Sequence, residues 1–166
     1  MRYFITFACY GAHLHGDEPG SVDRHHNLAG ARLLEADPQR AASSRKLMDQ
    51  APYTLDEKRR VHVLDALRDV CSHFRWDLLA AHVRTNHVHA IVEAEARPER
   101  VMNAFKGYAS RGLNRLGLDG PDRKLWARHG STRWLWKDED VLNAIRYVVE
   151  EQGEPMAVFL AETPAP

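Results

Sequence analysis

The sequence predicts a single α+β domain with a ferredoxin-like, split βαβ arrangement, in which an antiparallel sheet carries helices packed on one face. Two observations predict it. Stretches typical of strands are interspersed with stretches of helical spacing, in the order strand, helix, strand, strand, helix, strand, helix. A chain of 166 residues, 44% of them apolar, is also long enough for one domain to bury a core without help from disulfides.

The first half of the chain contains the less regular elements. Arg2–Cys9 is rich in aromatic and β-branched residues and predicts a strand. The segment 11–52 follows with glycine, proline and four histidines, and we expect loop there with a short helix near 41–49. Thr54 opens a capping box before apolar residues spaced three and four apart, so a helix is expected from Thr54 to about His73.

The second half of the chain has clearer signals at the ends of its elements. Arg75–Val83 and His87–Ala94 predict two strands joined by a tight turn, which makes a hairpin. A helix is expected over Pro98–Leu116, because proline stands at its first turn and glycine follows its last residue. Ser131–Trp136 predicts a short strand, and Asp138–Gln152 predicts a final helix with acidic residues in its first turn.

Cysteine content and apolar runs bear on the compartment. Cys9 and Cys71 fall in apolar stretches, so we expect two buried thiols. No leader-like segment opens the sequence, and no apolar run approaches the length of a membrane span. The expectation is a cytoplasmic protein with no membrane partner.

Charge is balanced overall but not along the chain. Residues 101–137 hold eight basic and two acidic side chains, a net charge of +6, whereas 138–166 carry a net charge of −6. The basic segment favours a path for nucleic-acid phosphates, and its tryptophans could stack on unpaired bases. The candidates for such DNA contacts are Lys106, Arg111, Arg133, Trp134 and Lys137.

Two histidines stand two residues apart in a predicted strand. Side chains alternate across a strand, so His87 and His89 point to the same face, about 6 to 7 Å apart along it. Val88 and its alternate neighbours would then face the core. Neutral imidazoles bind Mn, Zn and similar ions and leave positions for further ligands. His13 and His15 have the same spacing, but they lie in a loop where this alternation is not expected.

Two tyrosines are candidate nucleophiles. Tyr108 falls in the apolar stripe of its predicted helix and is expected to face the core. Tyr147 lies roughly 160° from the centre of the apolar stripe of the last helix, at about 100° per residue. Glu151 follows it by one turn on the same face, and Gln152 projects closer to the apolar stripe.

Three motifs in this order carry a resemblance to a known family. The strand reads Thr-Asn-His-Val-His-Ala-Ile-Val from Thr85, the next helix contains Phe-Lys-Gly-Tyr-Ala-Ser from Phe105, and the last helix contains Arg-Tyr-Val-Val-Glu-Glu-Gln from Arg146. Together they resemble the single-tyrosine HUH transposases, which are small insertion-sequence enzymes and their REP-associated relatives. The resemblance covers about 75–159 and the first strand.

The resemblance implies a site and a reaction. His87 and His89 match the family's two metal-binding histidines, and a divalent metal, Mg or Mn, is expected there. Tyr147 matches the nucleophile, which cleaves single-stranded DNA and stays joined to its 5′ phosphate. The family's third ligand, often Gln or Asn, follows the tyrosine by one turn, a place held here by Glu151, with Gln152 as the neighbouring alternative.

The resemblance also implies an organisation. Residues 1–160 are expected to form one HUH transposase-like domain with a long loop insertion at 11–52, followed by a flexible tail, 161–166. The partner is expected to be single-stranded or hairpin DNA. Relatives act as homodimers or as monomers, so both remain open here.

Other functions are compatible with these residues. One is a non-catalytic relative that only binds DNA hairpins. Another is a small-molecule metallohydrolase that uses His87, His89 and Glu151, which would not need the basic segment. A replication initiator or relaxase of the wider HUH group is a further alternative, but such proteins typically have larger chains with additional domains, which 166 residues do not accommodate.

Overall fold

The computed structural model describes residues 1–12 and 38–162 of the chain. The strands are β1 (Arg2–Cys9), β2 (Asp77–Val83), β3 (His87–Glu93), β4 (Trp126–Trp134) and β5 (Ala157–Leu160). The helices are α1 (Pro38–Lys46), α2 (Glu57–Phe74), α3 (Pro98–Arg115) and α4 (Asp138–Glu150). All four strand pairings are antiparallel, in the order β4-β1-β3-β2-β5. The expected α+β, ferredoxin-like fold is confirmed.

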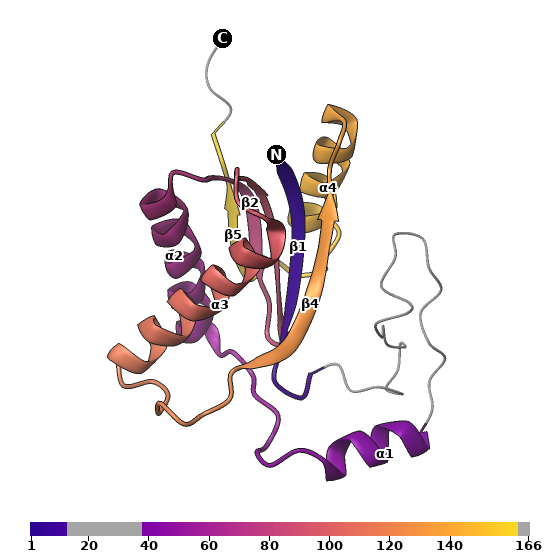
Figure 1. Cartoon of the computed structure of the whole chain (residues 1–166), viewed down its shortest axis with the longest axis vertical. Helices are drawn as coiled ribbons and strands as arrows, with labels where there is room; N and C mark the ends of the chain where they lie inside the picture. The colour runs from indigo at the N-terminus through magenta and orange to yellow at the C-terminus, as the bar shows by residue number, and fades with distance from the viewer. Residues whose placement is uncertain (13–37, 163–166) are drawn as a thin grey trace.

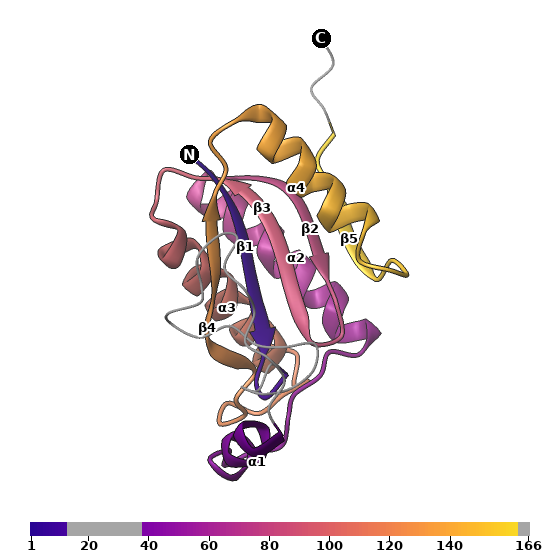
Figure 2. The same cartoon turned by 90° about the vertical axis from the view of Figure 1, so that its right-hand side faces the viewer.

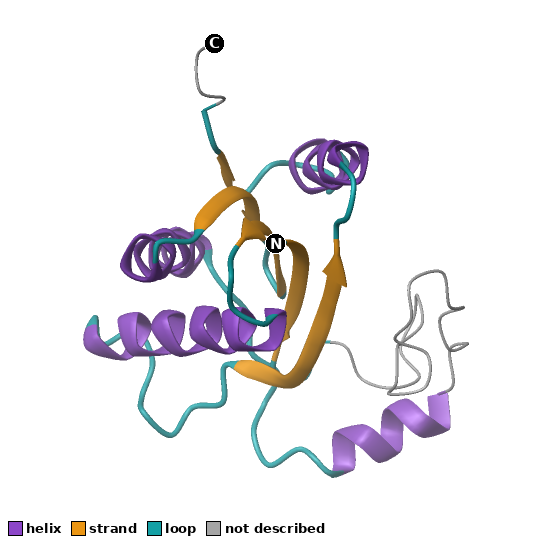
Figure 3. Cartoon of the chain, turned by 45° about the horizontal axis from the view of Figure 1, so that its top comes forward, coloured by secondary structure: helices purple, strands orange, loops and turns teal. Residues whose placement is uncertain are grey.

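The helices cover both faces of the sheet, which corrects the expectation that all pack on one face. Figure 1 and Figure 2 show α2 and α3 on one side of the strands and α4 on the other. In Figure 3, α1 lies apart from this layered body. Two clusters of buried side chains follow from this arrangement, a large one on the α2/α3 face and a smaller one, around Ile91 and Val148, on the α4 face.

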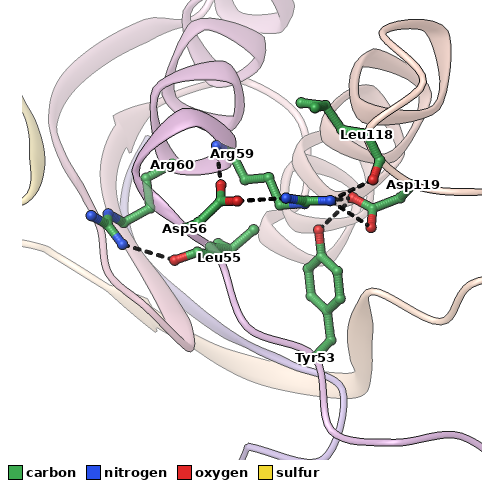
Figure 4. A network of polar contacts seen from close by, with 7 residues as sticks. All are labelled: Tyr53, Leu55, Asp56, Arg59, Arg60, Leu118 and Asp119. Atoms are coloured by element: carbon green, nitrogen blue, oxygen red, sulfur yellow. Dashed lines mark hydrogen bonds and ion pairs between the residues drawn. The ribbon is translucent and has the colours of Figure 1, made fainter.

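The start of α2 differs from the predicted capping box. The N-cap is Asp56 rather than Thr54, and its side chain accepts a hydrogen bond from the Arg59 backbone N–H at 2.8 Å. An Asp carboxylate is a strong N-cap, and Arg59 Nη1 also bonds to it at 2.6 Å. The guanidinium of Arg59 reaches further, to Asp119 and the carbonyl oxygen of Leu118 (Figure 4). Tyr53 Oη donates to the same Asp119, so this network ties the entry of α2 to the turn after α3.

The last two strands also differ from the sequence prediction. β4 begins at Trp126 instead of Ser131 and ends at Trp134. Gly130 allows its close approach to β1, because a Cβ there would lie 2.5 Å from the carbonyl oxygen of Thr6. β5 was not predicted, because its four residues, Ala157–Leu160, are too few to show a clear period.

The structure also bears on the predictions for the cysteines, the short helix in the insertion and membrane-spanning segments. Cys9 and Cys71 are free and buried, as expected, and burial raises the pKa of each thiol to about 12. The short helix expected near 41–49 is α1, at Pro38–Lys46. His13, His15 and most of the insertion at 11–52 lie outside the described residues. Among the described residues, no helix is long and apolar enough to cross a membrane.

Candidate functional site

The histidine pair projects from β3 toward α4. Val88, Ala90 and Val92 are buried in the large cluster on the α2/α3 face, so the alternation predicted for this strand is confirmed. His87 and His89 therefore share the opposite face, and their ring centroids are 4.7 Å apart. The two imidazoles are close enough to bind one ion.

His89 is held neutral by its surroundings. Its exposed fraction is 7%, and burial lowers its pKa to about 3, with the nearby His87 as the next cause. The Thr6 hydroxyl on β1 lies 2.8 Å from Nδ1. A hydroxyl can donate or accept. When the Thr6 hydroxyl accepts, Nδ1 carries the proton and the lone pair of His89 is on Nε2, where an ion can bind it.

His87 is oriented by its neighbour in the turn. Its Nδ1 lies 2.7 Å from Asn86 Oδ1, and an amide oxygen only accepts, so Nδ1 carries the proton. The lone pair is then on Nε2. A metal-binding histidine commonly donates its other ring N–H to an oxygen in this way. The donor set on β3 therefore fits a divalent cation.

Tyr147 on α4 lies against one member of this pair, His89. Its ring centroid is 5.8 Å from that of His89 and 5.9 Å from that of Phe4 on β1. Its predicted position off the apolar stripe of α4 agrees with its exposure, and the buried residues of the helix are Val141, Ala144 and Val148. Tyr147 lies at the margin of the true buried face, with 41% of its surface exposed.

The residues after Tyr147 do not continue the helix as the sequence predicted. α4 ends at Glu150, and Glu151 is its C-cap, with an exposed side chain. Among the described residues, no third histidine, cysteine or carboxylate joins His87 and His89, so Glu151 is not brought to them. Gln152 is. Its side chain lies near enough to the His89 ring to favour the protonated imidazole, and its Nε2 donates to the carbonyl oxygen of Tyr147 at 3.3 Å.

Of the five predicted DNA contacts, Lys106 serves the fold instead. Its Nζ donates to the carbonyl oxygens of Ala127 and His129, at 2.9 and 3.1 Å, and so ties α3 to β4. Burial lowers its pKa to about 8. The sequence placed Lys106 on an open helix face because β4 was predicted to begin later.

The other four lie on different sides of the sheet. Arg133 pairs with Phe4, so its exposed side chain projects from the same face as the histidine pair. Trp134 points to the opposite face, edge-on to Tyr3, and stacks on the exposed Trp136. Arg111 is on α3, over the ring of the partly buried Tyr108, whose expected core-facing position is confirmed. Lys137 is exposed at the N-cap of α4.

Three residues of the site were missed by the sequence reasoning. Phe4 and Thr6 belong to β1, and their alternation would have placed them on one face, but only the register with β3 brings Thr6 opposite His89. His82 is fully buried on β2, paired with His89. No sequence pattern indicated a role for His82, since a single histidine in an apolar strand is compatible with many roles.

The chain is similar to proteins of one known family. The model of the family described as "Transposase IS200 like" matches residues 51–144, a range that includes the histidine pair and ends before Tyr147. No curated protein matches the chain. A solved REP-associated tyrosine transposase bound to a REP hairpin is similar in structure, with a TM-score of 0.48 and 10% identity. That similarity covers 90% of this chain and 65% of the other.

A second solved structure, described as a transposase from Deinococcus radiodurans R1, has a TM-score of 0.46 and 18% identity, over 92% of this chain and 90% of the other. The family model covers more than half of the 166 residues. The chain therefore belongs to the IS200-like transposase family.

Proposed function

We propose that this protein cleaves single-stranded or hairpin DNA and joins the cut end to another strand through a 5′-phosphotyrosine at Tyr147. The observation that carries the proposal is the contact between Tyr147 and His89, with ring centroids 5.8 Å apart, in a chain of the IS200-like transposase family. A phenol beside two imidazoles combines a nucleophile with donors for a divalent cation.

His87, His89 and Gln152 are the residues that would hold Mg²⁺ or Mn²⁺. Gln152 is preferred to Glu151 because its side chain is the one that contacts His89. When bound, the ion supplies positive charge that stabilises the developing negative charge on the scissile phosphate. Asn86 and Thr6 contact Nδ1 of the two rings and so orient them on the α4 face of the sheet.

In the cleavage step, Tyr147 Oη attacks phosphorus and an O–P bond forms. The bond from phosphorus to the 3′ oxygen breaks, and its electron pair stays on that oxygen, which takes up a proton. The phenol releases its own proton, and water can accept it because Tyr147 is 41% exposed. The bond energy is conserved in the phosphotyrosine, so a second 3′ hydroxyl can reverse the step and join strands without ATP.

Arg133 supports a path for the DNA strand on this face. It is exposed, and it shares the sheet face of Phe4, on which Tyr147 packs. A guanidinium there can bind phosphate oxygens in a bidentate manner. The strand would then pass over β1 and β4, beside α4 rather than beneath α2 and α3.

The test is formation of a covalent protein–DNA band. Labelled hairpin and unstructured single strands are incubated with Mn²⁺ or Mg²⁺ and resolved on a denaturing gel. We expect a band that requires metal, disappears in Tyr147→Phe, and falls at least about a hundredfold in the double variant His87→Ala/His89→Ala.

The matched control is Tyr108→Phe, which removes the hydroxyl of the other candidate tyrosine and should leave the band intact. A band that survives Tyr147→Phe would overturn the assigned nucleophile. Tight hairpin binding with no band in wild-type protein would identify a binder without cleavage activity. Hydrolysis of small phosphodiesters that DNA does not inhibit would instead favour a metallohydrolase.

A further inference from the structure

We propose that His82 is a positioning residue, which holds the turn bearing Gln152 against the histidine pair. This inference rests on the proposed function, because it concerns how the third metal-binding side chain is held. His82 lies on β2, is fully buried, and pairs across the strands with His89.

Both ring nitrogens of His82 bond to backbone atoms that flank Gln152. Nδ1 lies 2.9 Å from the carbonyl oxygen of Val148, in the last turn of α4. Nε2 lies 3.1 Å from the backbone N–H of Met156, just before β5. A carbonyl only accepts and an N–H only donates, so the ring is the neutral tautomer with its proton on Nδ1. One side chain therefore spans the two ends of the segment 148–156.

Other contacts also hold the turn, and β5 pairs with β2 from Ala157 onward, directly after Met156. Arg84, two residues after His82 along the chain, donates from Nη1 to the carbonyl oxygen of Glu154 at 2.5 Å. Gln152 itself bonds back to the carbonyl oxygen of Tyr147. After α4 ends at Glu150, the turn is thus held from β2, through His82, Arg84 and the pairing with β5.

A purely structural role explains these bonds less well. An apolar side chain would fill a buried site on a sheet without the cost of desolvating an imidazole. The ring instead makes two long-range bonds, to partners 66 and 74 residues away, at the two ends of the turn that bears Gln152. Residues that orient metal ligands in this way typically alter metal affinity by about 10- to 100-fold when they are replaced.

Three substitutions separate the two bonds. His82→Leu removes both. His82→Asn places an amide near the Nδ1 position and keeps the bond to Val148. His82→Gln reaches the Nε2 position and keeps the bond to Met156. Leu67→Ala, in the core on the other face of the sheet, is the control for lost stability alone.

Two readouts apply. Mn²⁺ affinity is measured on the free protein by electron paramagnetic resonance. The position of Gln152 is measured in metal-free protein by nuclear Overhauser contacts between its side-chain amide and the His89 ring. We expect His82→Leu to weaken Mn²⁺ binding about tenfold or more and to lose the contact. The Mn²⁺ affinity of His82→Gln should stay within about threefold of wild type, and this variant should keep the contact between Gln152 and His89. His82→Asn should resemble His82→Leu in both readouts.

The inference is wrong if His82→Leu keeps both the Mn²⁺ affinity and the Gln152 contact, or if Leu67→Ala shifts them equally. Should His82→Leu not fold, the contrast between the Asn and Gln variants decides. The proposed function fails separately, when wild-type protein forms no covalent band with DNA. Should wild-type protein bind no Mn²⁺, the Gln152 contact in metal-free protein still decides the role of His82.

Discussion

The two faces of the sheet use the same strands to bury different kinds of side chain. On the α2/α3 face, large apolar residues such as Phe7, Phe105 and Leu67 are almost fully buried in one extended cluster. On the α4 face, the apolar cluster is small, and two histidines, His82 and His89, are buried beside it. The difference teaches that the first face supplies the stability of the fold and the second the candidate chemistry.

The polar groups of the α4 face are satisfied by the chain itself. His89 is bonded at Nδ1 by Thr6, and His82 by backbone atoms of α4 and the turn after it. Buried polar groups are tolerated only when they are bonded in this way, and such networks fix one arrangement of the groups involved. The α4 face therefore has less apolar burial, and its buried histidines are held by specific bonds.

The largest expected effect compares core truncations on the two faces. Phe105→Ala should lower the free energy of unfolding by about 3 to 5 kcal/mol, because it opens a cavity in the main core. Val148→Ala, in the small cluster, should cost only about 1 to 3 kcal/mol. Urea unfolding measures both. We expect only Val148→Ala to raise the Mn²⁺ concentration needed for the covalent band. A similar increase in Phe105→Ala would break the comparison.

The next effect is the pH dependence that the buried histidines create. Burial lowers the folded-state pKa of His82, and that of His89 to about 3, whereas the unfolded value is near 6.5. Below about pH 6.5 the unfolded chain binds protons that the folded one does not. The stability that the two neutral histidines contribute is thus fully present above pH 6.5 and is lost on acidification. From His89 alone, the free energy of unfolding falls by about 2 kcal/mol between pH 7 and 5.

Urea unfolding with EDTA at pH 7, 6 and 5 measures this slope. His89→Asn should flatten it, whereas His129→Asn, at an exposed position on β4, should leave it unchanged. An equal slope in wild type and His89→Asn would contradict the prediction.

The smallest effect tests which face the DNA contacts. Arg133→Ala should weaken single-stranded DNA binding several-fold and reduce the slope of log affinity against log salt by about one, as expected for one lost phosphate contact. Arg111→Ala, on the α3 side, should change neither by more than about twofold. Fluorescence anisotropy at several salt concentrations measures both. The reverse order would place the DNA path on the α2/α3 face.

Much of the fold could be predicted because local signals agreed. β1 has the predicted bounds, and β3 and α3 each end one residue early. These segments have clear periodicity or glycine and proline at their ends. The start of α2 was misplaced because Thr54 and Asp56 both have capping side chains, and tertiary contacts of Arg59 favour Asp56.

Only the part of the site that lies within one strand could be predicted from local sequence pattern. Alternation places His87 and His89 on one face, and this is a property of a single strand. The choice between Glu151 and Gln152 is different, because α4 ends at Glu150 and helical spacing no longer decides which side chain faces β3. Lys106 looked exposed for a related reason, since its acceptors lie on a strand far along the chain.

The sequence by itself determined the family, the order of the elements from β1 to α4, and the histidine pair, since each depends on residues that are close together along the chain. Only the tertiary structure decided that α4 covers the opposite face of the sheet, that Tyr147 contacts His89 across it, and that His82 spans the turn of Gln152. These features join residues 58 to 74 positions apart. Periodicity describes one element at a time, whereas such contacts depend on how separate elements pack.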